Sequence, residues 1–200
     1  MLTSDFFDDK TEAIISLEQF YGEKKHIVEK CLIVFSKEIH TYLLNSFECE
    51  QIGELGACGS LDKERTKGRF VVPTESYRGE GCSHYYVPAS DYIEIKNADK
   101  VAAVLGKLGA PYVKGRVWTT DSMLRETKGL VSKRKNEGCI AVEMELAGVQ
   151  AVCDFYGLEL FDFLEAGDVL SDSGYEVEGL HEANHSLGKV LLALEIAVNL

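Results

Sequence analysis

Short apolar segments alternate with segments of helical periodicity along this 200-residue chain, and this alternation constrains the fold more than any other feature. Apolar runs that predict strands lie at 31–35, 69–72, 112–119, 139–142 and 158–164. Helical patterns lie at 36–47, 98–108, 144–156 and 179–200. We expect Asn97 to cap the second helix and Pro73 to end the strand before it. The alternation predicts an α/β fold with a largely parallel sheet and helices on both faces.

The charge balance of the chain is acidic. Lys and Arg number 21 and Asp and Glu number 33, which gives a formal net charge of −12. Because nucleic acids and anionic membranes are bound by clusters of Lys and Arg, we expect neither as a partner. The densest basic stretch, 128–135, is typical of a solvated helix face.

The length of the chain and the spacing of its cysteines indicate what kind of protein it is. The length predicts one domain over residues 1–200. The apolar runs are far shorter than the roughly 20 residues that cross a bilayer, and the acidic N-terminus does not resemble a secretory signal. The six cysteines form no C-x-x-C pair, so we expect reduced thiols, no metal and a cytoplasmic location.

Three residues at a predicted strand-to-helix junction, Glu143, Met144 and Glu145, are candidates for sugar binding. A carboxylate there can accept hydrogen bonds from two hydroxyls of a sugar, and a methionine can pack under an apolar ring face. Acidic residues also favour the first turn of a helix for electrostatic reasons alone. Both interpretations are compatible with the pattern.

Asp168 is the second candidate, because it follows the apolar run 158–164. Ligands of open α/β sheets bind outside the carboxyl ends of the strands. A partly desolvated carboxyl at such a place has a raised pKa and can deliver a proton. The neighbouring 171–174 segment is rich in turn residues, so a loop aspartate without a chemical role is the alternative.

A glycine turn and a single tryptophan complete the set of candidates. Gly56 and Gly59 enclose a turn after the segment Ile52–Leu55, and glycines let the backbone approach an anion closely. Trp118 lies near the end of the run 112–119, where an indole can stack on a nucleobase or fill the core.

In this order, the motifs resemble the nucleoside phosphorylase superfamily, which includes purine nucleoside phosphorylases, uridine phosphorylases and methylthioadenosine nucleosidases. The matching segments are Gly56-Ala57-Cys58-Gly59-Ser60-Leu61, Val71-Val72-Pro73-Thr74, Arg78 to Tyr85, Trp118-Thr119-Thr120-Asp121, Val142-Glu143-Met144-Glu145 and Gly167-Asp168. The resemblance covers about residues 50 to 198. It implies a three-layer fold with a mixed, largely parallel central sheet flanked by helices.

The resemblance also implies an activity, which is cleavage of the N-glycosidic bond of a purine or pyrimidine nucleoside. Glu145 and Met144 would hold the ribose beside Glu143, and Asp168 would protonate the leaving base. Trp118, Thr119 and Arg125 would lie near the base, and Gly56 and Ala57 near phosphate. The ligands would be a nucleoside and inorganic phosphate, with no cofactor, in a homo-oligomer.

The chain departs from the family pattern on the phosphate side. The family's glycine-rich phosphate turn is missing from residues 1–50, so the fold is expected to be abbreviated at its N-terminal side. Glu54 stands where the family has a phosphate-binding arginine, and Ala57 where it often has a hydroxyl residue. Three hypotheses stay open: a phosphorylase with a rebuilt phosphate site, a hydrolase that uses water, and a nucleoside-binding relic.

A competing motif lies near the C-terminus, where residues 181–185 read H-E-x-x-H. On a helix this pattern places two imidazoles on one face, as a zinc-dependent hydrolase requires. At ~100° per residue, however, His181 and His185 lie away from the apolar stripe of that helix. The fifteen residues that remain continue the same helix and offer no third ligand, so a metallohydrolase is the remote alternative.

Overall fold

A single mixed sheet forms the centre of the protein. The computed structural model describes residues 57–171, 174–177 and 187–199, together with residues 7, 8, 10, 18, 19, 22, 23 and 31. The strands are β1 (Ala57–Ser60), β2 (Phe70–Gly79), β3 (Tyr92–Glu94), β4 (Tyr112–Thr120), β5 (Cys139–Glu143), β6 (Leu164–Ser171) and β7 (Gly174–Glu176). Their order across the sheet is β3-β2-β4-β5-β1-β6-β7.

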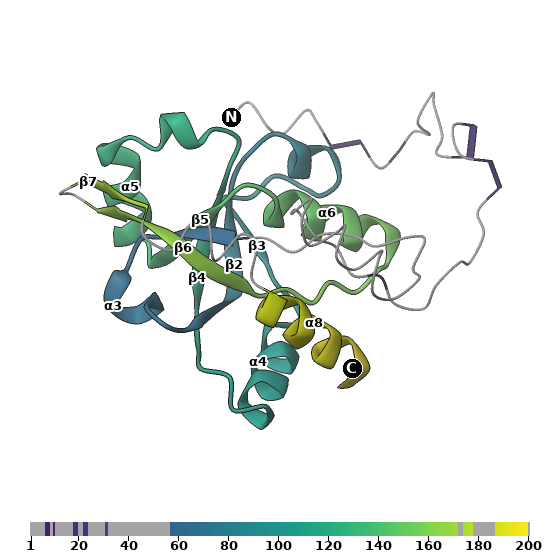
Figure 1. Cartoon of the computed structure of the whole chain (residues 1–200). Coiled ribbons are helices and arrows are strands. Elements are labelled where there is room, and N and C mark those ends of the chain that lie inside the picture. The colour runs from purple at the N-terminus through teal and green to yellow at the C-terminus, as the bar shows by residue number, and fades with distance from the viewer. Residues whose placement is uncertain are drawn as a thin grey trace.

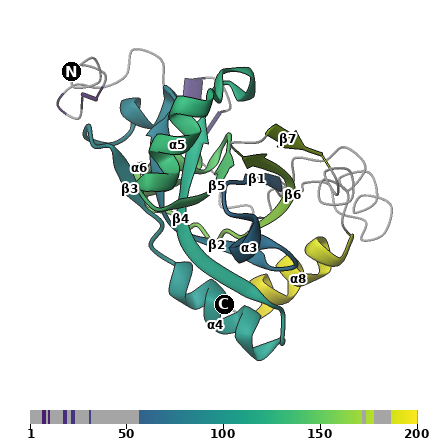
Figure 2. The ribbon, with the colours of Figure 1, turned by 90° about the vertical axis from the view of Figure 1, so that its left-hand side faces the viewer.

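Helices cover both faces of this sheet (Figures 1 and 2). They are α3 (Lys63–Thr66), α4 (Ala98–Lys107), α5 (Lys128–Asn136), α6 (Leu146–Tyr156) and α8 (Leu187–Asn199), with the 3-10 turns η1 (Cys82–Tyr85) and η2 (Met123–Arg125). Val71 of β2 packs with α6 residues, whereas its neighbour Val72 packs with residues of α4 and α8. Because successive strand residues point to opposite faces, α6 lies on one face and α4 and α8 on the other.

The same alternation places α5. Val117 of β4 packs in the cluster that includes α6 residues, whereas Trp118 packs with Val131 of α5. Helix α5 therefore lies on the face opposite α6, which confirms the predicted α/β architecture of a sheet between helical layers.

The strand pairings show how mixed the sheet is. The pairs β1–β6, β2–β4 and β4–β5 are parallel. The pairs β1–β5, β2–β3, β2–β6 and β6–β7 are antiparallel. The edge strands β3 and β7 are three residues each and lie in segments where the apolar pattern predicted no strand.

Helix α4 matches its prediction closely. It begins after Asn97 and ends before Gly109, whose φ of +69° is a left-handed conformation that glycine adopts without strain. Asn97 does not cap the helix with its side chain, however; its amide donates to the carbonyl of Leu160 at 3.0 Å. The asparagine therefore connects the start of α4 to the segment that leads into β6.

Two predicted strand bounds are wrong. β2 continues through Pro73 to Gly79, because the proline lies where the β2–β4 register shifts and its missing N–H costs no regular ladder bond. The apolar run 158–164 is not a strand; β6 begins at Leu164, where that run ends. Its apolar residues instead pack as a connector, with Leu160 against the α6 cluster and Phe161 against the α4–α8 cluster.

The basic stretch 128–135 is exposed only in part. Arg134 has 3% of its surface exposed, and its guanidinium lies 3.2 Å from the ring centroid of Tyr77 and pairs with Glu137. The segments 32–47 and 52–56 and the H-E-x-x-H motif lie outside the described residues. Within the described part of the chain, no helix is long and apolar enough to span a membrane.

Candidate active site

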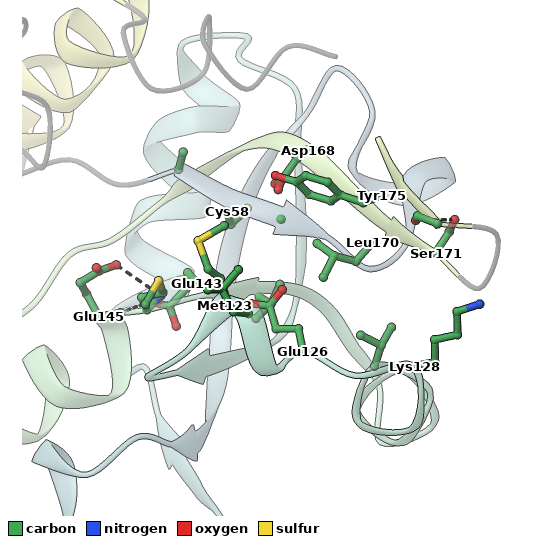
Figure 3. Close-up of a pocket in the computed structure, with 17 residues that line it drawn as sticks. Cys58, Met123, Glu126, Lys128, Glu143, Glu145, Asp168, Leu170, Ser171 and Tyr175 are labelled. Carbon is green, nitrogen blue, oxygen red and sulfur yellow. Dashed lines mark hydrogen bonds between the residues drawn. The ribbon is translucent and has the colours of Figure 1, made fainter. Parts of the chain in front are cut away.

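A cavity of about 690 Å³ brings together the carboxyl groups that the sequence singled out. Its walls come from β1, from the ends of β5 and β6, from η2 and the start of α5, and from β7. In the close-up of Figure 3, Glu145 lies at one side and Lys128 at the other, with Asp168 and Glu126 between them. Predicted residues Ala57, Glu143, Met144, Glu145 and Asp168 all line this cavity.

Glu143 is held by the protein itself. Its carboxylate accepts hydrogen bonds from the backbone N–H groups of Glu145 (2.7 Å) and Leu146 (2.6 Å) and from the Thr119 hydroxyl. The two N–H groups lie at the start of α6, where no helical carbonyl can accept from them. Burial nevertheless raises the pKa of Glu143 to about 8.

A relay of hydroxyl groups fixes the orientation of that carboxylate. Because Thr119 donates to Glu143, it must accept from the Ser76 hydroxyl at 2.6 Å, and it also accepts from the Ala147 N–H at 3.0 Å. Ser76, Thr119 and Glu143 therefore connect β2, β4 and β5 beneath the cavity.

Met144 and Glu145 present more accessible groups. Met144 is 40% exposed and precedes α6, and Glu145 is the half-buried N-cap residue of that helix. The Glu145 carboxylate accepts a long 3.3 Å bond from the Met144 N–H. A carboxylate and a thioether at the cavity mouth can together receive the hydroxyls and the apolar face of a sugar.

Asp168 lies within β6, not after the end of a strand as the sequence predicted, and its half-buried side chain enters the cavity. The Tyr175 hydroxyl from β7 donates a hydrogen bond to its carboxylate, which lowers the pKa, but burial outweighs this bond and raises the pKa above the usual aspartate value. A carboxyl group with a raised pKa is a better proton donor at neutral pH than an ordinary aspartate.

The turn predicted at residues 56–59 is wrong, because Ala57 to Ser60 form strand β1, which lines the cavity with Ala57, Cys58 and Gly59. Gly59 pairs with Asp168 in the parallel β1–β6 ladder, and a Cβ at Gly59 would lie 3.1 Å from Asp168 Oδ1 and 2.6 Å from a methyl group of Leu170. Cys58 beside it is 3% exposed, and burial with nearby carboxylates raises the pKa of its thiol far above the usual value. This thiol is therefore not a nucleophile at neutral pH. Gly56 lies outside the described residues.

Three residues expected near a base do not line this cavity. Trp118 is 4% exposed and packs against Leu61, Val131 and Val142. Thr119 is fully buried behind Glu143, and Arg125 is exposed on η2. A base held in the cavity would therefore meet other side chains.

Two further cavity residues, Glu126 and Tyr175, carry no signal in the sequence pattern. Glu126 follows the three-residue turn η2, and Tyr175 lies on the edge strand β7. Burial and the nearby Asp168 carboxyl raise the pKa of Glu126 to about 7. Only the position of Glu126 just after the long strand β4 could have suggested a role, since side chains at strand ends gather around such cavities.

The described residues contain no cluster of side chains suited to a metal ion. Among residues 57–171, 174–177 and 187–199, no group of three or more His, Cys, Asp or Glu side chains could hold a metal ion.

The family of the chain follows from a comparison of its sequence. Residues 39–187 match the family model of the Phosphorylase superfamily. The chain belongs to this family. Among curated family members, the purine nucleoside phosphorylase DeoD-type of Bacillus cereus is 25% identical over 129 residues, which is 63% of this chain and 55% of that protein. The chain thus spans about half the length of this phosphorylase.

A second curated family member aligns over a longer stretch. The purine nucleoside phosphorylase DeoD-type of Bacillus cytotoxicus is 23% identical over 159 residues, which is 78% of this chain and 67% of that protein.

Solved structures of the family share the fold. Purine nucleoside phosphorylase from Toxoplasma gondii, solved in complex with immucillin-H, has a TM-score of 0.60 at 18% identity, over 84% of this chain and 71% of that one. AMP nucleosidase from Bacteroides thetaiotaomicron has a TM-score of 0.57 at 20% identity, over 72% of this chain and 57% of that one. Futalosine hydrolase from Helicobacter pylori has a TM-score of 0.56 at 19% identity, over 81% of this chain and 74% of that one.

Proposed function

We propose that this protein cleaves the N-glycosidic bond of a nucleoside in the cavity between β5, β6 and η2. The observation that carries the proposal is the placement of Asp168, a half-buried carboxyl with a raised pKa, in the same cavity as Glu145 and Met144. The cavity volume of about 690 Å³ lies within the range of roughly 300–1,000 Å³ that is usual for small-molecule sites. The phosphorylase superfamily to which the chain belongs makes this the first chemistry to test.

Glu145, Met144 and Asp168 would have different roles in the reaction. Glu145 accepts hydrogen bonds from ribose hydroxyls, and Met144 packs against the sugar. As the bond between C1′ and the base nitrogen breaks, its electron pair goes to the base, and Asp168 delivers a proton to a base nitrogen. The oxocarbenium-like sugar is stabilised by the negative potential of the surrounding carboxylates, until an oxygen nucleophile adds to C1′.

The nucleophile is phosphate in a phosphorylase and water in a nucleosidase. Of the charged side chains that line the cavity, Glu126, Glu143, Glu145 and Asp168 are acidic and Lys128 alone is basic among the described residues. A phosphate dianion would be repelled by the carboxylates that are ionised. Ala57 contributes no hydroxyl to hold the anion. This lining favours water as the nucleophile, with phosphorolysis as the second candidate because the named relatives are phosphorylases.

A nucleoside panel tests both forms of the proposal. Purified protein is incubated with purine and pyrimidine nucleosides, with and without inorganic phosphate, and free base is measured by chromatography. Base release at the same rate in both buffers supports hydrolysis, and release only with phosphate supports phosphorolysis. If no nucleoside releases base in either buffer, the catalytic proposal is wrong.

We also propose that the cavity is completed in a homo-oligomer. Apolar side chains with large exposed fractions border it: Met123 at 54%, Leu124 at 88% and Met144 at 40%. Exposed apolar groups of this size at a cavity rim are typical of an interface. Light scattering after gel filtration should give a mass that is a multiple of 22.2 kDa, and a monomer at micromolar concentration would contradict this.

A further inference from the structure

Glu126 differs from its neighbours in where its side chain lies. Met123 and Leu124 of η2 and Lys128 at the start of α5 are all exposed to solvent, whereas Glu126 between them is half-buried. Its carboxyl group lines the cavity that also contains Asp168 (Figure 3). The turn thus places the carboxyl of Glu126 inward, whereas the side chains of Met123, Leu124 and Lys128 are exposed.

Hydrogen bonding separates Glu126 from the other carboxyl groups of the cavity. Glu143 accepts three hydrogen bonds from the protein, and Asp168 accepts one from Tyr175. The carboxyl of Glu126 has no hydrogen-bond partner among the described residues, and its resolved electrostatic neighbours are Asp168 and the Tyr175 hydroxyl. A partly desolvated carboxyl without a protein partner is stabilised by a ligand that brings a donor to it.

The position of Glu126 indicates which part of a nucleoside brings that donor. Glu145 lies at one side of the cavity, at the start of α6, where a ribose would lie. Asp168, which would protonate a ring nitrogen of the base, interacts electrostatically with Glu126. A group near the proton donor for the base is therefore near the base itself rather than the sugar.

Building on the proposed function, we propose that Glu126 contacts the base and selects nucleosides whose base carries an amino group or a ring N–H. The carboxylate accepts from that N–H, while Asp168 delivers its proton to a different nitrogen of the same ring. Bases without such a donor leave Glu126 unpaired and bind more weakly. Glu126 is thus a specificity-determining residue of the cavity.

Binding of free bases tests this assignment without requiring turnover. Calorimetry compares the 9-methyl derivatives of adenine and purine, called adenine and purine below; the methyl group takes the place of the sugar and removes the ring N–H, so the two ligands differ only in the amino group. In the unchanged protein, we expect adenine to bind about 10-fold more tightly than purine, as one hydrogen bond to a charged acceptor predicts. Glu126→Leu should reduce this ratio to within about twofold, while Glu126→Gln, which keeps a neutral acceptor, should retain an intermediate ratio.

Glu94→Leu is the matched control, because Glu94 is exposed on β3 and does not line the cavity. It should leave the adenine-to-purine ratio unchanged, and urea titration confirms that each variant is folded. An unchanged ratio in folded Glu126→Leu, or in Glu126→Gln if the leucine variant does not fold, overturns the assignment. If neither base binds the unchanged protein, the assignment is also wrong. If bases bind with the expected ratios but no nucleoside is cleaved, Glu126 remains a base contact and only the catalytic proposal fails.

Discussion

Two walls of the cavity differ in how many hydrogen bonds the protein donates to their carboxyl groups. At the β5–α6 junction, the protein itself donates three hydrogen bonds to Glu143 and fixes its orientation through Thr119 and Ser76. On the facing wall, built from η2, β6 and β7, the Asp168 carboxylate accepts from the Tyr175 hydroxyl and from its own backbone N–H, and Glu126 has no donor among the described residues. Glu143 on the first wall accepts its hydrogen bonds from the protein itself, whereas Glu126 on the second wall has acceptor oxygens available to a ligand.

The difference indicates a division of labour. A carboxyl group whose oxygens are occupied by backbone and hydroxyl donors positions the start of a helix, but it has few lone pairs left for a substrate. A carboxyl that lacks partners is available for proton transfer or for recognition. We therefore expect mutations of Glu143 and Thr119 to change mainly stability, and mutations of Asp168 and Glu126 to change mainly activity.

Asp168→Asn should give the largest effect on the second wall. Asparagine keeps the shape and can still accept from Tyr175, but it cannot donate a proton from a carboxyl group. We expect base release to fall by about 10²- to 10⁴-fold. The free energy of unfolding should not decrease, because burial already disfavours the charged form of Asp168.

Initial rates with the best nucleoside of the panel measure this loss. Asp99→Asn is the control, since Asp99 is highly exposed on α4 and pairs with Lys114 at the surface. A rate within threefold of the unchanged protein for Asp168→Asn would remove Asp168 from the mechanism.

Thr119→Val should give the largest stability effect on the first wall. Valine has the shape of threonine but cannot donate to Glu143 or accept from the Ala147 N–H, so it leaves buried polar groups unpaired. We expect a loss of about 2–4 kcal/mol in the free energy of unfolding, measured by urea titration. Thr120→Val is the matched control; its hydroxyl accepts one long bond of 3.4 Å, and its loss should cost about 1 kcal/mol or less. Equal losses for the two variants would contradict the relay.

The pH dependence of stability should distinguish the open carboxyl of Glu126. Its pKa rises from 4.5 in a free chain to about 7 when folded, so folding is favoured most below pH 4.5 and loses this contribution as pH rises toward 7. Glu126→Gln removes the penalty and should raise the free energy of unfolding by about 1 kcal/mol at pH 8, a figure kept low because the group is only half-buried. The variant should match the unchanged protein at pH 4.

Urea titrations at several pH values measure this difference. Asp168 and Glu143, whose pKa values are also raised by burial, share the cavity in both proteins, so only the difference between the two curves reports on Glu126. Parallel curves from pH 4 to pH 8 would show that Glu126 has an ordinary pKa.

Lys128→Ala should have the smallest effect. Lys128 is exposed at the cavity edge and is the sole basic side chain among the described lining residues. If water is the nucleophile, base release without phosphate should stay within about twofold, because an exposed charge contributes little to a neutral reactant. A rate that depends on phosphate and falls more than 10-fold in the variant would favour phosphorolysis and give Lys128 a role in anion binding.

The architecture and part of the site were predictable from local patterns. Helix α4 and the strand before α6 follow from apolar periodicity and capping residues, and Asp168 and Glu145 follow from their positions after apolar segments. The start of β6 was misplaced because an apolar run also fits a buried connector, and only pairing with β1 and β7 decides which residues form the strand.

The remaining site depends on contacts between distant segments. Trp118 was a candidate for the base, but alternation along β4 turns its side chain toward α5 and into the core. Glu126 faces the cavity only because β6 and β7 lie opposite η2, and no pattern within residues 123–130 reports that pairing. The sequence shows which residue types are capable of chemistry, but it gives much less information about which of their side chains face one another.

Gly59 sets a limit on how the cavity can vary. All three atoms that crowd a Cβ at this position belong to the side chains of Leu170, Asp168 and Val142, and none to the backbone. Alanine there would thus be tolerated by the sheet, yet it would press on the carboxyl of Asp168. If Asp168 carries out the proposed proton transfer, selection for folding and selection for activity differ at this residue. Folding alone would tolerate a change at Gly59, and the reaction would not.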